Sequence, residues 1–162
     1  MSSGALHTSG EALPALAFAF EARVTVGPPL DIGDVQGTRR RIIPITGGMV
    51  AGKRLSGNVL PGGADWQVLR ADGVTEVVAR YAIQANDGAL IPVVNSGLRH
   101  APPEIMRQLT EGRRVDPALV YFRTVPVFHP PDGPHAWLGR SIFLGIGERQ
   151  PDLVIIRVFE VL

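Results

Sequence analysis

The chain of 162 residues contains no cysteine, which excludes disulfides, thiol nucleophiles and zinc or iron–sulfur centres held by cysteine. It also lacks an apolar run of bilayer length, and its first residues show neither the basic start nor the apolar stretch of a secretory signal. Neither sign of charge is in excess, because 16 lysines and arginines stand against 15 acidic residues. We therefore expect a cytoplasmic protein with no nucleic-acid partner and no membrane partner.

The chain is rich in residues that end secondary-structure elements, with 19 glycines and 14 prolines spread along its length. Leu16–Val26 alternates apolar and polar residues, which is typical of a half-buried strand. Similar runs predict further strands at Thr38–Thr46, Met49–Leu60, Ala89–Leu98, Leu119–Phe128, Ser141–Glu148 and Leu153–Leu162, and the stretch Leu60–Tyr81 predicts two strands joined by a turn at Asp72-Gly73. Leu30–Gly37 is expected to be a loop, and one short helix is predicted after Pro102.

This pattern predicts an all-β fold, because one helix cannot supply the crossovers of a parallel sheet. A barrel or a sandwich fits, and the long strands without a charged, protected edge favour the barrel. We expect a single antiparallel β-barrel domain of about eight to nine strands over residues 13–162, preceded by a flexible tail at residues 1–12. A barrel of this size can hold one small ligand.

Two turn signals place three polar side chains in one row. If Asp72-Gly73 and Asn86-Asp87-Gly88 both close two-residue hairpins, counting outward pairs Asp65 with Arg80, and Arg80 with Asn95. A guanidinium held between a carboxylate and an amide would be a fixed cation beside a proton acceptor. The alternative is a solvent-facing ion pair worth under about 1 kcal/mol. The opposite face of these strands is the more apolar one, so the residues alone leave both interpretations open.

Other polar residues are weaker candidates. His129 ends a predicted strand where a barrel mouth would lie, and it could serve as an acid or base. On the same strand, Arg123 is expected to be a buried charge, with Tyr121 on its face. The loop from His129 to His135 matches no metal-site spacing, and the glycines before Lys53 lack the helix of a phosphate-binding loop. We therefore expect no metal site and no cofactor.

Short motifs along the chain resemble a family of mainly bacterial and fungal proteins catalogued as domain of unknown function 3237. The matching runs include Pro44-Ile-Thr-Gly-Gly48, Leu60-Pro-Gly-Gly-Ala-Asp-Trp66, Arg70-Ala-Asp-Gly73, Ala79-Arg-Tyr81, Asn95-Ser-Gly97, Tyr121-Phe-Arg-Thr124, Ala136-Trp-Leu138 and Gly145-Ile-Gly147. The resemblance implies a compact, oligomeric β-barrel, calycin-like or allene-oxide-cyclase-like in general shape, with no established cofactor. It also places Asp65, Trp66, Arg80, Asn95, Arg123 and Trp137 on motif positions of the family. The chain departs from the pattern at His129-Pro130, where the family has Glu-Thr, and at Gly139, where it has Asn.

Together these observations predict a homo-oligomeric barrel that binds a small, partly apolar, oxygen-rich molecule. The preferred hypothesis is a cofactor-independent enzyme of the isomerase, cyclase or hydro-lyase type. Asp65 or His129 would move the proton, and Arg80 and Arg123 would stabilise negative charge. Trp66, Asn95, Tyr121 and Trp137 would position the substrate. A non-catalytic carrier or sensor, and a structural barrel filled with side chains, are the alternatives.

Overall fold

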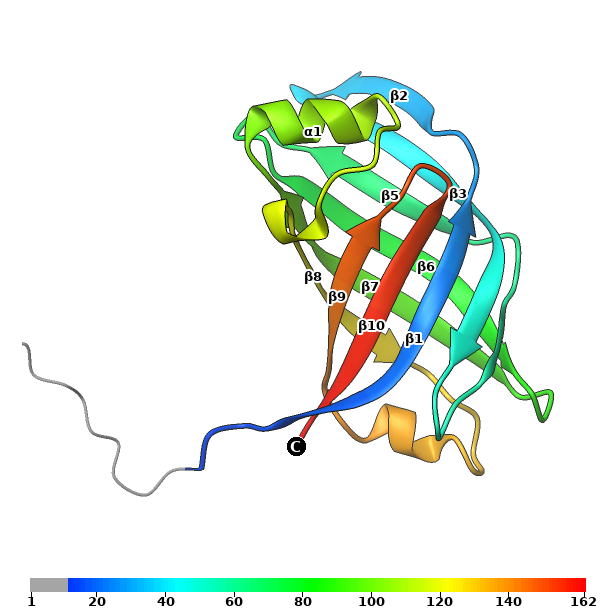
Figure 1. Cartoon of the computed structure of the whole chain (residues 1–162). Helices are drawn as coiled ribbons and strands as arrows, with labels where there is room; N and C mark the ends of the chain where they lie inside the picture. Colours follow the sequence, from blue (N-terminus) through cyan, green and yellow to red (C-terminus); the bar gives the residue numbers. More distant parts are fainter. Residues whose placement is uncertain (1–11) are drawn as a thin grey trace, which may run out of the picture.

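The computed structural model describes residues 12–162, which form ten strands, one α-helix and two short 3₁₀ helices (Figure 1). The strands are β1 (Leu16–Val26), β2 (Leu30–Val35), β3 (Thr38–Ala51), β4 (Gly57–Val59), β5 (Ala64–Leu69), β6 (Thr75–Ala85), β7 (Leu90–His100), β8 (Tyr121–Phe128), β9 (Phe143–Arg149) and β10 (Leu153–Val161). The helices are α1 (Pro103–Thr110), η1 (Pro117–Leu119) and η2 (Ala136–Gly139). The tail expected at residues 1–12 lies outside the described residues except for Ala12.

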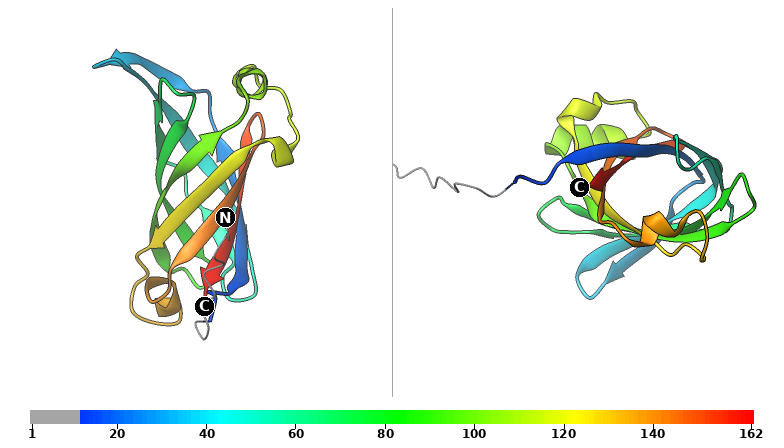
Figure 2. Two further views of the ribbon diagram at one scale, coloured as in Figure 1. Left: turned by 90° about the vertical axis from the view of Figure 1, so that its left-hand side faces the viewer. Right: turned by 90° about the horizontal axis from the view of Figure 1, so that it is seen from below.

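The strands close into an antiparallel barrel, as predicted. Hydrogen-bonded pairing runs from β1 through β10, β9, β8 and β7 to β6, which is joined to β3 by way of β4 and β5, and β3 pairs with β1 to complete the ring. Strands β4 and β5 lie one after the other between β3 and β6, and β2 extends outward from β3. The view along the barrel in Figure 2 shows the closed ring. Helix α1 lies at the end of the barrel that is uppermost in Figure 1, called the upper end below.

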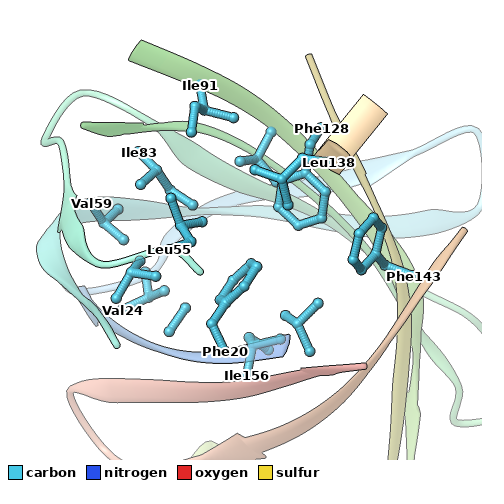
Figure 3. Close-up of a cluster of buried hydrophobic side chains, with 14 of the residues drawn as sticks. Phe20, Val24, Leu55, Val59, Ile83, Ile91, Phe128, Leu138, Phe143 and Ile156 are labelled. Carbon is cyan, nitrogen blue, oxygen red and sulfur yellow. The ribbon is translucent and has the colours of Figure 1, made fainter. Parts of the chain in front are cut away.

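The lower half of the barrel is packed with apolar side chains (Figure 3). The rings of Phe20 and Phe128 meet edge to face at 5.6 Å between centroids, and those of Phe128 and Phe143 do so at 5.2 Å. Helix η2 adds Leu138, which is only 1% exposed. Edge-to-face aromatic pairs add to the stabilisation from burial. The lower end is therefore closed by a solid core.

The turn between β5 and β6 differs from the predicted hairpin by one residue. The last paired residues are Leu69 and Thr75, and the amide of Arg70 donates to the carbonyl of Val74 at 2.9 Å. Three residues therefore form the loop, with Gly73 at a φ of +88°. A three-residue loop of this kind, a type I turn followed by a left-handed glycine, is the next most common hairpin after the two-residue turns.

The turn between β6 and β7 has the same form, since the amide of Ala85 donates to the carbonyl of Ala89 at 2.9 Å. The predicted row Asp65–Arg80–Asn95 is therefore wrong at its centre. Asp65 pairs with Ala79, and Ala79 pairs with Asn95. A shift of one residue moves a side chain to the other face of the sheet, so Arg80 points outward and is exposed. The two shifts cancel for Asp65 and Asn95, which share one inward row.

A second correction concerns Leu30–Gly37, which forms strand β2 where a loop was expected. The turn into β3 has Gln36 at a φ of +52° and Gly37 at +80°. Positive φ at both central residues is the geometry of a two-residue type I′ hairpin. The two-residue hairpin thus occurs at Gln36-Gly37, inside the segment that was expected to be a loop.

Candidate functional site

A cavity of about 50 Å³ lies in the upper half of the barrel, above the apolar core. On this measure one water needs roughly 10–15 Å³, so the space takes a small ligand or one end of a larger one. The wall is mainly apolar, with polar side chains concentrated toward the upper end. Its polar members are Asp65, Gln67, Tyr81, Asn95, Arg99, Thr124 and Arg149.

Asp65 is the acidic residue of this cavity. Its Oδ1 accepts a hydrogen bond of 3.1 Å from the backbone amide of Val78, and its Oδ2 accepts one of 2.6 Å from Nε2 of Gln67. Burial raises the pKa of the Asp65 carboxyl, although these hydrogen bonds and the charges of Arg99 and Arg41 act in the opposite direction. Such a carboxyl is suited to give and take a proton closer to neutral pH than an exposed aspartate.

Gln67 connects this carboxylate to an arginine. Its Oε1 accepts a hydrogen bond of 2.6 Å from Nε of Arg41, and its amide nitrogen then donates to Asp65. Gln67 is 4% exposed, so its orientation is fixed by these two contacts and by packing. The chain Arg41–Gln67–Asp65 holds the carboxylate in one position at the wall of the cavity.

Three arginines from three different strands approach the upper end of the cavity. Arg41 is on β3, Arg99 on β7 and Arg149 on β9, and all three line a second cavity of about 130 Å³ between the barrel and α1. The two cavities share Ile43, Gln67, Arg99 and Arg149. We call this opening, with its three arginines, the mouth of the barrel.

Arg99 is the most buried of the three, with 4% of its surface exposed. Burial lowers the pKa of its guanidinium to about 10, and the charges of Arg41 and Arg149 contribute. The guanidinium lies over the ring of Phe122, 5.6 Å from its centroid. Burial also lowers the pKa of Arg41 and of Arg149. The mouth is therefore strongly positive and partly shielded from water.

Several buried polar atoms at the cavity have no hydrogen-bond partner within residues 12–162. They are Oδ1 of Asn95, Nε of Arg99 and Oγ1 of Thr124. Burial also raises the pKa of the Tyr81 hydroxyl at the same wall. A buried polar atom without a partner is costly unless a ligand or solvent supplies one. These atoms can therefore contact a polar molecule in the lumen.

The structure brings together only two of the residues predicted for the site, Asp65 and Asn95, which both line the cavity. Arg80 points away from it, as described above, and Trp66 is on the outer face with 51% of its surface exposed. Tyr121 and Arg123 also face outward, where the Arg123 guanidinium lies 5.3 Å from the Tyr121 ring centroid. The expected burial of Arg123 is therefore wrong.

The other two predicted residues lie at the lower end, opposite the mouth. His129 is exposed directly after β8. Trp137 is on η2, between the ring of Phe143 and the guanidinium of Arg54, which is 3.7 Å from the Trp137 ring centroid. Trp137 thus helps to close the barrel and does not face the cavity.

The sequence reasoning missed Arg41, Gln67, Tyr81, Arg99, Thr124 and Arg149. Alternation could have found Arg99, because Asn95, Gly97 and Arg99 follow one another on one face of β7. Gln67 likewise shares a face with Asp65 on β5. The arginines at the ends of β3 and β9 carry no such signal, since charged residues are common where strands end.

Among residues 12–162, no helix combines the length and apolar character needed to span a bilayer. In the same part of the chain, no three histidine, aspartate or glutamate side chains gather in a way that could hold a metal ion.

A family model described as Protein of unknown function (DUF3237) matches residues 14–161 of the chain. The chain is 41% identical over 145 residues to UPF0311 protein RPA1785 of Rhodopseudomonas palustris, which covers 90% of this chain and 95% of the relative. The crystal structure of that protein superposes with a TM-score of 0.91 over 94% of this chain and 100% of the other, at 39% identity.

Two further proteins are similar to the chain. A crystal structure described as a beta-barrel like protein, from Acinetobacter baumannii, has a TM-score of 0.82 and 32% identity, covering 95% of this chain and 99% of the other. Hydroalkoxylation enzyme phnH of Penicillium herquei is 36% identical over 83 residues, which are 51% of this chain and 55% of the relative.

Proposed function

The chain belongs to the family described as Protein of unknown function (DUF3237), and we propose, from the side chains that line its lumen, that it is an enzyme that catalyses proton transfer. The reaction class is isomerisation, cyclisation, or addition and loss of water, on a small, oxygen-rich and partly apolar molecule. One observation carries this proposal: Asp65, with a raised pKa, lines the same enclosed cavity as Arg99. A proton acceptor beside a buried cation is what removal of a proton from a substrate requires.

In this proposal Asp65 takes a proton from an O–H or C–H group of the substrate. Arg99 stabilises the negative charge that develops on a substrate oxygen, and Asn95 and Thr124 contact polar groups of the substrate. Asp65 then returns the proton to carbon or oxygen, so an isomerisation or cyclisation balances without a co-reactant. The expectation that no cofactor takes part remains a prediction, tested by measuring activity after treatment with a chelator, which removes metal ions, and after unfolding, dialysis and refolding, which removes bound organic molecules.

The fungal relative supports this reaction class. Hydroalkoxylation adds the O–H bond of an alcohol or phenol across a carbon–carbon multiple bond, so that the oxygen bonds to one carbon and the proton moves to the other. Hydroalkoxylation is the activity in the name of the fungal protein, and the sequence similarity between the two proteins covers about half of this chain. It favours addition of oxygen to an unsaturated carbon over other members of the proposed class.

Proton transfer is measured directly by exchange with solvent. Alkenyl phenols and enolisable hydroxy acids, together with any molecule that co-purifies, are incubated with the protein in D₂O, and deuterium at carbon is followed by NMR. We expect incorporation by the native protein, slower by about 10²-fold or more in Asp65→Asn. The control Asp34→Asn alters an exposed carboxylate on β2 and should behave as native.

Equal rates in Asp65→Asn and the native protein would exclude Asp65 as the proton carrier. A ligand that binds in the lumen and is returned without deuterium would instead indicate a carrier or sensor. Sedimentation velocity tests the expected homo-oligomer separately, because the proposed chemistry uses residues of one chain only.

A further inference from the structure

The mouth of the barrel contains more positive charge than the protein neutralises. Among the described residues, Asp65 is the acid whose charge acts on Arg41, Arg99 and Arg149 alike. Asp31 adds a contribution at Arg41, and Asp152 adds one at Arg149, but both acids are exposed, and Asp31 already forms an ion pair with Arg39. One inner carboxylate therefore faces three guanidinium groups.

The contacts of these arginines do not replace the missing negative charge. Arg41 donates from Nε to the neutral amide of Gln67, and Arg99 lies over an aromatic ring with its Nε unpartnered. Buried charges in proteins are normally paired, since an unpaired charge loses its hydration without compensation. A buried arginine that is aimed into a cavity and lacks an anion is thus set up for one supplied from outside.

We propose that the lumen binds a small organic anion whose carboxylate or other oxyanion lies against Arg99 at the mouth. Arg41 and Arg149 reinforce the attraction, and the apolar body of the ligand extends down toward Asp65 and Asn95. This inference rests on the proposed function in that it names the class of molecule taken by the same cavity. It concerns charge that the ligand brings with it, and not charge that forms during reaction.

The shape of the two cavities agrees with this orientation. The upper cavity, beside α1, is lined by all three arginines, and the inner cavity is mainly apolar below Arg99. An anion entering apolar end first would leave its charged group at the mouth. The planar guanidinium of Arg99 matches two carboxylate oxygens, which favours a carboxylate over a halide ion.

Benzoate and benzamide test the proposal, because they share shape and differ in charge. We expect isothermal titration calorimetry to show that benzoate binds the native protein at least about tenfold more tightly than benzamide. The preference should be lost in Arg99→Met and retained in Arg40→Met, which removes an exposed arginine next to Arg41 on β3. Sodium chloride should weaken binding of benzoate more than that of benzamide.

Equal binding of the two probes, unchanged benzoate binding in Arg99→Met, or no benzoate binding at 10 mM (roughly the weak end for so small a ligand) would overturn the proposal. If Arg99→Met does not fold, Arg149→Met replaces it, since Arg149 is only half-buried. Asp65→Asn separates this inference from the proposed function. It should abolish deuterium incorporation yet bind benzoate at least as tightly as the native protein, because a neighbouring negative charge is removed.

Discussion

Gln67 donates a hydrogen bond of 2.6 Å from Nε2 to Oδ2 of Asp65, and it does so while accepting one from Arg41. The amide therefore favours the ionised form of the carboxylate, against the effect of burial. In the proposed mechanism, Gln67 does not contact the reacting atoms of the substrate. It is a positioning residue, and its role is visible in how activity depends on pH.

Gln67→Leu should raise the pKa of Asp65 further, because burial is then opposed by one hydrogen bond fewer. Since the base must be ionised, we expect the rate of deuterium incorporation to fall by about tenfold on the acid side of the profile. On the alkaline side it should change by less than about threefold, as Asp65 is ionised there in both proteins. Gln84→Leu replaces an exposed glutamine of β6 and serves as the control. A uniform loss of rate at every pH would mean that Gln67 acts only in packing.

Arg99→Met should make the protein without ligand more stable. The pKa of Arg99 is lowered to about 10 in the folded state by burial, so the charged side chain disfavours folding at neutral pH. This penalty declines as pH rises from about 10 toward the usual arginine value. We expect the Tm of Arg99→Met to exceed that of the native protein by about 3 °C at pH 7, with a smaller difference at pH 10.5. Arg40→Met should leave the Tm unchanged, and a lower Tm in Arg99→Met would show that the charge is already compensated.

Gly97→Ala should destabilise the barrel, because β7 and β8 approach closely at this residue. A Cβ there would lie 2.2 Å from the carbonyl oxygen of Arg123, a backbone atom that cannot move without breaking the pairing. We expect a loss of about 1–3 kcal/mol in the free energy of unfolding, measured with urea. Gly139→Ala is the matched control, since its nearest neighbour would be Pro130 at 3.4 Å. Equal midpoints for the two variants would contradict the close approach.

Asp87 and His135 join the β6–β7 turn to the loop before η2, with 2.8 Å between Oδ2 and Nε2. The backbone amide of Ala89 and then His135 lower the pKa of Asp87. A lowered pKa stabilises the fold above the usual aspartate value, about 3.9, and this contribution is lost as pH falls through the folded value. We expect the urea midpoint to drop more steeply between pH 5 and 2.5 in the native protein than in Asp87→Asn. Asp132→Asn, in the same loop but exposed, should follow the native curve, and parallel curves for all three proteins would refute the prediction.

The barrel was predictable because most strands alternate clearly and are separated by glycine-containing turns. Strand β2 was not, since its residues are mostly exposed and its pattern depends on pairing with β3 alone. The register was not predictable either. Asp72-Gly73 fits both a two-residue and a three-residue loop, and only the observed hydrogen bond from the Arg70 amide to the Val74 carbonyl distinguishes them.

The site was predictable only in part for the same reason. Asp65 and Asn95 have the same spacing in both registers, because one extra residue in each turn cancels across the three strands. The face on which Arg80 lies depends on the length of one turn only, so the extra residue in that turn places its side chain on the outer face. Apolar residues on the outer face, such as Leu98, are the reason that the residues alone left the choice of the inner face open.

The solid lower half of the barrel has a kinetic consequence. Because Phe20, Phe128 and Phe143 fill the lower half of the barrel, the lumen is closed at that end. A ligand that enters past the three arginines of the mouth must therefore leave by the same route. A reaction product would therefore have to depart before the next substrate molecule could arrive. Product inhibition in such an enzyme would be purely competitive.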